Sequence, residues 1–150
     1  MIVTNTTFQL CPWADVLYAM DRAWWEKYIR EVRRSFKGFR YTAVGSCYDV
    51  AMSSVHHYKN SGAAAINLAA SFGAKKIILL GYDCQHTGGK AHWHSDHPKG
   101  LANAGKVATW PAQFNRLAQA LVGVEVINCS RQTALTCWPR EELENVLCAL

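Results

Sequence analysis

The sequence predicts an α/β protein in which helices flank a mostly parallel sheet. Short β-branched or apolar runs alternate with amphipathic or alanine-rich stretches along the chain, which is typical of this class. The run at 76–80 (KIILL) is almost continuously apolar, as in buried parallel strands. The chain has 150 residues, half of them hydrophobic, and is long enough for one domain with its own core. We therefore expect a single Rossmann-like domain over residues 1–150.

The N-terminal part predicts two strands and a helix. Residues 2–4 form a short β-branched run, and residues 15–20 (DVLYAM) predict a second strand. Residues 22–37 predict a helix that ends near Gly38. Its apolar stripe has helical spacing and consists of Trp25, Tyr28, Ile29, Val32 and Phe36.

The central part contains short β-like pieces at 41–54, around Gly45, and then a helix at 61–72 (SGAAAINLAASF) that ends at Gly73. Because the side chains of this helix are small, we expect it to pack closely against a sheet. The strand at 76–80 follows.

The C-terminal part begins with a polar loop rich in Gly and His, at about 84–108, interpreted as a lid. A helix at 109–121 and a strand at 124–128 (VEVIN) come next. The last expected element is a helix at 139–150. Its first turns carry acidic residues, where negative charge suits the helix dipole: Glu141, Glu142 and Glu144.

The net charge of +5 belongs to one segment. Residues 22–40 hold seven basic and two acidic residues, and the remainder of the chain is balanced. DNA or RNA is therefore not expected as the main partner. The basic face of the helix is interpreted as its solvated side, with contact to phosphates or an acidic partner as the alternative.

The sequence predicts a soluble, cytoplasmic protein. No apolar run approaches the roughly 20 residues that span a bilayer, and the N-terminus lacks a signal pattern. The six cysteines include no C-x-x-C pair, so we expect buried free thiols.

Candidate ligand-binding residues lie where strands end and helices begin. Ligands of parallel sheets bind at the carboxyl ends of the strands, where the sequence places Asn5, Asp21, Asp83 and Asn128. Asn60, Ser61 and Gly62 open a helix and predict an anion site, with a plain N-cap as the alternative. Trp24 lies off the apolar stripe and is a candidate for stacking on a base.

The loop at about 84–108 carries the motif HWHSDH, and three interpretations remain open. His92, His94 or His97 would act as a general base near pH 7, or the histidines would bind zinc, or the loop would be solvated without a role. The spacing H-x-H-x-D-H matches the metal motif of metallo-β-lactamase-like hydrolases. However, that fold needs a further histidine downstream, and none follows His97. No cofactor is expected.

The order of motifs resembles a group of small phage and prophage proteins over nearly the whole chain. The segments that carry this resemblance are VTNTTF, ADVLYAMDRAWW, NSGAAAINLAASFGAKKIILLGYD, HWHSDHP and VINCSRQTAL. Residues 60–83 are also similar to the bacterial sialyltransferases of glycosyltransferase family 42. The same core resembles the domain of motility accessory factors and archaeal pterin diphosphokinases.

The resemblance to the sialyltransferases implies roles for individual residues. Asn5 would contact the nucleotide, Ser61 and Gly62 would lie near its phosphate, and a histidine of the lid would be the general base. A polar motif after the last strand would correspond to Asn128, Ser130 and Thr133. Those enzymes also have an earlier strand with a Gly-rich loop, whereas this chain contains no G-x-G. We therefore expect nucleotide binding more than group transfer.

The sequence thus predicts a phage-type protein that binds a nucleotide-derived, phosphate-containing molecule, with sequestration of a host signalling nucleotide as one role. Its expected location is the host cytoplasm, and a homo-oligomer is left open. The alternative is a glycosyltransferase-like enzyme with a lid histidine as base, so enzyme activity is left undecided. A metal-dependent hydrolase at HWHSDH is the weaker alternative.

Overall fold

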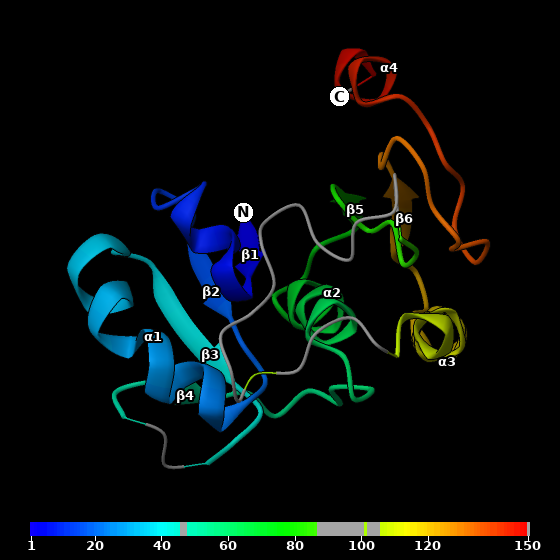
Figure 1. The fold of residues 1–150 in the computed structure, drawn as a ribbon. Helices are drawn as coiled ribbons and strands as arrows, with labels where there is room; N and C mark the ends of the chain where they lie inside the picture. The colour runs from blue at the N-terminus through cyan, green and yellow to red at the C-terminus, as the bar shows by residue number, and fades with distance from the viewer. Residues whose placement is uncertain (46–47, 87–100, 102–105, 150) are drawn as a thin grey trace. The chain divides into compact units, whose positions relative to one another are not determined.

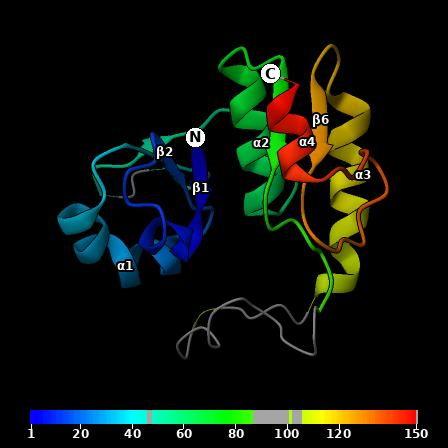
Figure 2. The ribbon, with the colours of Figure 1, turned by 90° about the horizontal axis from the view of Figure 1, so that it is seen from above.

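The computed structural model describes residues 1–45, 48–86, 101 and 106–149. These residues form two compact units, Met1–Phe72 and Gly73–Leu150, and each unit has its own parallel sheet (Figures 1 and 2). The α/β class, with parallel strands and flanking helices, is confirmed. The single Rossmann-like domain stays a prediction.

The first unit contains a four-stranded sheet whose spatial order, β1-β2-β3-β4, follows the chain. All of its strand pairs are parallel, and Thr4, Tyr18 and Tyr41 lie side by side in register. The predicted strands at 2–4 and 15–20 are confirmed, and the predicted β-like pieces at 41–54 correspond to the end of β3 and to β4. The elements are β1 (Ile2–Thr4), the 3-10 helix η1 (Asn5–Gln9), β2 (Val16–Tyr18), α1 (Arg22–Ser35), β3 (Phe39–Thr42), β4 (Ala51–Met52) and α2 (Ser61–Ser71).

Helix α2 packs against β1 and β2 through its small side chains, as the sequence predicts. Ala64 and Ala65 contact Val16 and Tyr18 in one buried cluster that Leu68 completes. Alanine carries no bulk beyond its methyl group, so the helix backbone can approach the sheet closely. The side chain of Tyr18 is fully buried as a result.

The buried face of α1 is wider than the predicted stripe because η1 covers it from the side. Trp24 was expected to be available for a ligand, but it is only 4% exposed. The ring of Phe8, from η1, meets Trp24 edge-on with centroids 6.0 Å apart. The ring of Tyr28 lies 5.0 Å from Trp24 on the same helix. Trp24 is therefore a core residue of this unit.

Gly38 has a different role from the predicted helix stop. Helix α1 ends at Ser35, and Phe36 caps it in an extended conformation. A Cβ atom on Gly38 would overlap the carbonyl oxygens of Ala14 and Asp15. The neighbouring Phe39 N–H donates to the Asp15 carbonyl at 2.8 Å. Gly38 therefore permits the close backbone approach that starts the β2–β3 pairing.

The second unit contains a two-stranded parallel sheet, β5 with β6, in which Lys76 lies opposite Glu125 and Leu79 opposite Asn128. Of the residues of β5, Leu79 is buried and Lys76, Ile77 and Ile78 are half-buried, so the predicted buried strand is confirmed at Leu79 alone. Among the described residues, β5 pairs with β6 alone, which leaves its other edge without a strand. The elements are β5 (Lys76–Leu79), η2 (Val107–Thr109), α3 (Trp110–Ala120), β6 (Glu125–Asn128) and α4 (Leu143–Cys148).

The last helix begins four residues later than predicted. Pro139 and Glu141 lie beside the end of β6: the Asn128 N–H donates to the Pro139 carbonyl at 2.8 Å, and the Glu141 N–H donates to the Asn128 carbonyl at 3.1 Å. The Pro139 carbonyl, which a helix starting at this residue would need as an acceptor, is thus already bonded to β6. Glu142 is therefore the N-cap residue, and Glu144 is the acidic residue of the first turn.

The thiols of the described cysteines are free, but they differ in exposure. Cys84 is buried, Cys148 is exposed, and the others are intermediate, namely Cys11, Cys129 and Cys137. Burial of the free thiols is thus confirmed for Cys84. In the described part of the chain, no helix has both the length and the hydrophobicity to cross a membrane.

We expect Gly38→Ala to lower the free energy of unfolding by about 2 kcal/mol, because the new methyl group would collide with backbone atoms that cannot move without breaking the sheet. Urea denaturation followed by circular dichroism measures this change. Gly45→Ala is the matched control, since its Cβ would meet only the end of the Met52 side chain, at 3.3 Å. Equal stabilities of the two variants would contradict the explanation.

Candidate functional site

The second unit has a pocket of about 420 Å³ where β5 and β6 end. Because parallel strands end at the same edge of a sheet, the loops that follow β5 and β6 meet there. Asp83, predicted from this rule, lines the pocket. The described residues that line it are Gly81, Asp83, Cys129, Ser130, Arg131 and Gln132.

Asn128, the last residue of β6, is fully buried and bonded at both ends of its amide. Its Oδ1 accepts from the Ser130 N–H at 3.0 Å. Its Nδ2 donates to Thr133 Oγ1 at 3.1 Å and to the Tyr82 carbonyl at 3.4 Å. We predicted a contact with the ligand, but these bonds direct the side chain into the protein. Asn128 therefore positions the loop that forms one wall of the pocket.

Ser130 and Thr133 tie that loop to the loop after β5. The Tyr82 N–H donates to Ser130 Oγ at 2.7 Å, and Thr133 Oγ1 donates to the Tyr82 carbonyl at 2.7 Å. The Ala134 N–H donates to the carbonyl of Asp83 at 2.8 Å. The three polar residues that the family resemblance singled out thus form one network, and this network fixes the backbone that carries Asp83.

The chemistry of the pocket comes from one carboxylate, one guanidinium and a neutral thiol. The side chain of Arg131 is exposed and forms no ion pair with any described residue. Desolvation, and after it the charges of nearby glutamates such as Glu141, raises the pKa of the Cys129 thiol. The thiol is then protonated near neutral pH, which favours noncovalent binding over nucleophilic attack. The sequence did not single out Arg131, because no local pattern marks a residue that only the meeting of two loops brings to a pocket.

The first unit gathers titratable groups where β2 ends. The Tyr18 hydroxyl is buried and has no hydrogen-bond partner among the described residues. Burial and the charge of Asp21 raise the pKa of Tyr18 to about 12. Desolvation also raises the pKa of Asp21, while the charge of His57 opposes that shift. Asp21 was predicted as a site residue, whereas Tyr18 and His57 were missed because neither has a distinctive sequence context.

The two asparagines of this unit that were predicted as ligand residues, Asn5 and Asn60, have clear backbone roles. Asn5 follows β1 directly and has a φ of 48°, a left-handed conformation that Asn tolerates better than most residues. Asn60 caps α2, since its Oδ1 accepts from the N–H groups of Gly62 at 2.9 Å and Ala63 at 3.2 Å. The capping interpretation is thus confirmed. Anion binding by Asn60, Ser61 and Gly62 stays a prediction.

The predicted catalytic histidines, His92, His94 and His97, lie outside the described residues. The same holds for the zinc site and for most of the predicted lid. Within the described ranges, no group of three or more His, Cys, Asp or Glu side chains is arranged to hold a metal ion.

Comparisons with protein-family models, curated proteins and solved structures give no match to this chain. The resemblance to phage proteins and to the sialyltransferase group therefore stays a prediction. The geometry itself defines an α/β protein with a pocket at the carboxyl ends of two parallel strands.

We expect Asn128→Ala to lower the free energy of unfolding by about 2–3 kcal/mol without any ligand, because the buried Ser130 N–H loses its acceptor. Chemical denaturation of the ligand-free protein measures the loss. Asn67→Ala is the control, since it removes one exposed bond, from Asn67 Nδ2 to the His56 carbonyl, and should cost about 1 kcal/mol or less. A stability unchanged in Asn128→Ala would refute the positioning role.

We expect Asp21→Asn to make the protein more stable at pH 7 than the natural chain. The folded-state pKa of Asp21 is raised, so its ionisation costs stability once the pH rises above the unfolded value of 3.8. The gain should disappear at about pH 3, where the carboxyl group is protonated in both states. Thermal melts from pH 3 to 8 follow the difference, with Asp15→Asn as the control, since the pKa of Asp15 is lowered. A gain in stability that is the same at every pH would disprove the assignment.

Proposed function

We propose that the chain binds a nucleotide-derived, phosphate-containing small molecule in the pocket where β5 and β6 end. The observation that carries this proposal is that Arg131 and Asp83 line the same pocket. A guanidinium group can donate two parallel hydrogen bonds to a phosphate. A carboxylate at a strand end is suited to accept hydrogen bonds from ribose hydroxyls.

The size and rigidity of the pocket support a small ligand. A volume of about 420 Å³ lies within the range of small-molecule sites. The walls are held by the network of Asn128, Ser130 and Thr133, so little ordering is needed when the ligand binds. With Cys129 protonated, the pocket is better suited to hold a ligand than to attack one.

The phage origin and the sequestering role remain part of the proposal, on the strength of the sequence resemblance alone. The glycosyltransferase alternative depends on His92, His94 or His97, and no described contact favours it. Binding without transfer is therefore the function that the described residues support best.

Calorimetric titration of Arg131→Gln and Asp83→Asn, with a panel of mono-, di- and cyclic nucleotides and their nucleosides, tests the proposal. Arg131→Gln should weaken nucleotide binding about tenfold or more and leave nucleoside binding unchanged, because only the phosphate contact is lost. Asp83→Asn should weaken both. Arg116→Gln, an exposed arginine on α3 that does not line the pocket, is the matched control.

Two results would count against this function. One is the absence of binding by the natural protein across the whole panel. The other is an equal loss of nucleotide affinity in Arg131→Gln and Arg116→Gln. That result would mean that the phosphate responds to the overall positive charge of the protein and not to a contact in the pocket.

A further inference from the structure

The first unit has a second hollow, of about 290 Å³, at the opposite ends of its strands from Asp21. It lies where β2 and β3 begin, between the loop before Val16 and the turn after α1. Trp13, Asp15, Lys37, Gly38 and Phe39 are among its lining residues, and we call it the Trp13–Phe39 groove. It shares no residue with the pocket of the proposed function.

The groove presents two large aromatic rings to solvent on a fixed floor. Trp13 is 72% exposed and Phe39 is 73% exposed, whereas most aromatic side chains of this unit are buried or half-buried. The backbone beneath them is held by the bond from Phe39 N–H to the Asp15 carbonyl and by the close approach of Gly38. Two exposed aromatic rings on this backbone offer flat surfaces for stacking.

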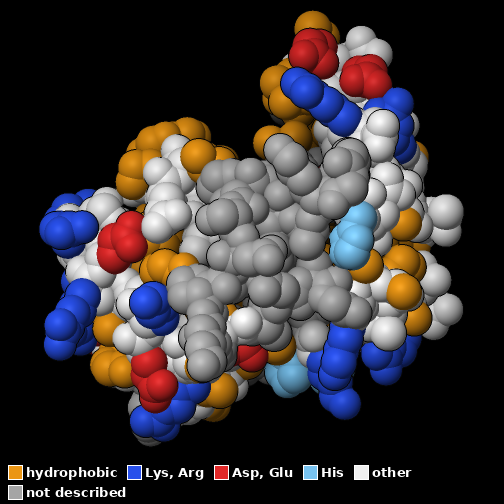
Figure 3. Space-filling view, viewed as in Figure 1, with side chains coloured by type: hydrophobic (Ala, Val, Ile, Leu, Met, Phe, Trp, Pro, Cys, Tyr) orange, Lys and Arg blue, Asp and Glu red, His pale blue; other side chains and the backbone are white. Residues whose placement is uncertain are grey.

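A row of unpaired cations leads along α1 to the groove. Lys27, Arg30 and Arg34 are spaced by three and four residues, so they share one face of α1 and span about 10 Å. Lys37 follows the helix end and lines the groove itself. None of these four side chains has an ion pair with a described residue. Figure 3 shows Lys and Arg side chains gathered over the region of α1.

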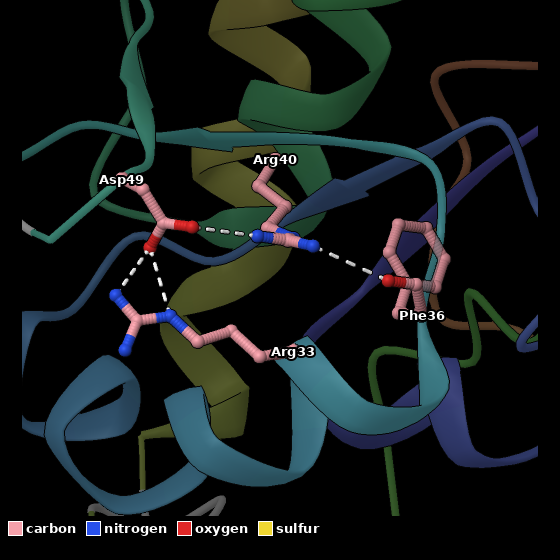
Figure 4. Close-up of polar contacts among 4 residues, drawn as sticks. All are labelled: Arg33, Phe36, Arg40 and Asp49. Atoms are coloured by element: carbon pink, nitrogen blue, oxygen red, sulfur yellow. Dashed lines mark hydrogen bonds and ion pairs between the residues drawn. The ribbon is translucent and has the colours of Figure 1, made fainter.

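The other cations of the segment are already paired. Arg33 and Arg40 both bind the carboxylate of Asp49, at 2.8 and 2.9 Å (Figure 4). Arg22 pairs with Glu26 at 3.1 Å. The nearby Glu31 accepts a hydrogen bond from the Gln9 amide at 2.9 Å. The cations of residues 22–40 that have no ion pair with a described residue are therefore the four of the row that ends in the groove.

We propose that the Trp13–Phe39 groove and the cationic row bind single-stranded nucleic acid. The two exposed rings stack on bases, and Lys37, Arg34, Arg30 and Lys27 contact successive phosphates. Aromatic platforms beside a line of unpaired cations are the common chemistry of single-strand binding. A duplex would keep its bases stacked away from the rings, and an acidic peptide would use the cations but not the flat ring faces. The sequence alone favoured a solvated face for this helix and did not predict DNA or RNA as the main partner, since the excess charge belongs to residues 22–40 alone.

The test is fluorescence anisotropy with labelled oligothymidine and oligouridine of 12 nucleotides. A duplex of 12 base pairs and a polyglutamate peptide are measured for comparison. We expect single strands to bind more tightly than the duplex, with a salt slope of about −3, as four phosphate contacts require. Trp13→Ala and Phe39→Ala should each weaken binding about tenfold, as the loss of one stacked base does. Trp13→Phe should restore most of the affinity. Arg30→Gln, Arg34→Gln and Lys37→Gln together should reduce the salt slope by about 2.

Matched controls separate these effects from changes in folding. Phe72→Ala alters another exposed aromatic residue of the same unit, and Arg116→Gln alters a cation of α3, so neither should change the affinity. Circular dichroism confirms that each variant is folded. Equal affinity for duplex and single strands, an unchanged affinity in both ring variants, or tighter binding of polyglutamate than of the oligonucleotides would overturn the proposal.

Discussion

A parallel strand that ends at the sheet edge leaves backbone N–H groups that need acceptors, and the architecture of both units depends on how those groups are bonded. Three strands use the same solution. A polar side chain at the strand end accepts from the amide two residues later: Thr42 from Val44, Ser53 from Val55, and Asn128 from Ser130. Among the described residues, these three are the majority of the buried polar side chains. Each loop therefore turns in a defined direction as it leaves the sheet.

This constraint limits what a polar residue at a strand end reveals about function. Asn128 and Asn60 match the expected pattern of ligand residues, yet their side chains bond to the backbone nearby. Asp83 follows the same rule of position and is one of the residues that line the pocket. Position along a strand thus predicts where a site lies, whereas the choice between ligand contact and backbone support depends on where each side chain points.

The sequence predicted the helices and strands that follow from the residue pattern within one segment. It missed the features that depend on contacts between segments far apart in the chain. The helix at 61–72 and the strand at 124–128 were correct to within one residue. The start of the last helix was wrong because Pro139 pairs with β6, a contact that no local pattern reveals. Trp24 was predicted to be available for stacking, but it is buried because Phe8 of η1, which is distant in the sequence, packs against it. The sequence did not place Arg131, Trp13 or Phe39 in a pocket, because each becomes part of one only when separate segments fold beside one another.

Asp49 shows how one exposed carboxylate can hold three segments in place. It binds Arg33 near the end of α1 and Arg40 in β3, while Arg40 also donates to the Phe36 carbonyl at 3.3 Å (Figure 4). The turn between these arginines contains Gly38, so the brace surrounds the backbone that forms the floor of the groove. Hydrogen bonds from Arg33 lower the pKa of Asp49. Asp49 therefore stays ionised to a lower pH than an ordinary surface carboxylate, and its ion pairs with Arg33 and Arg40 persist with it.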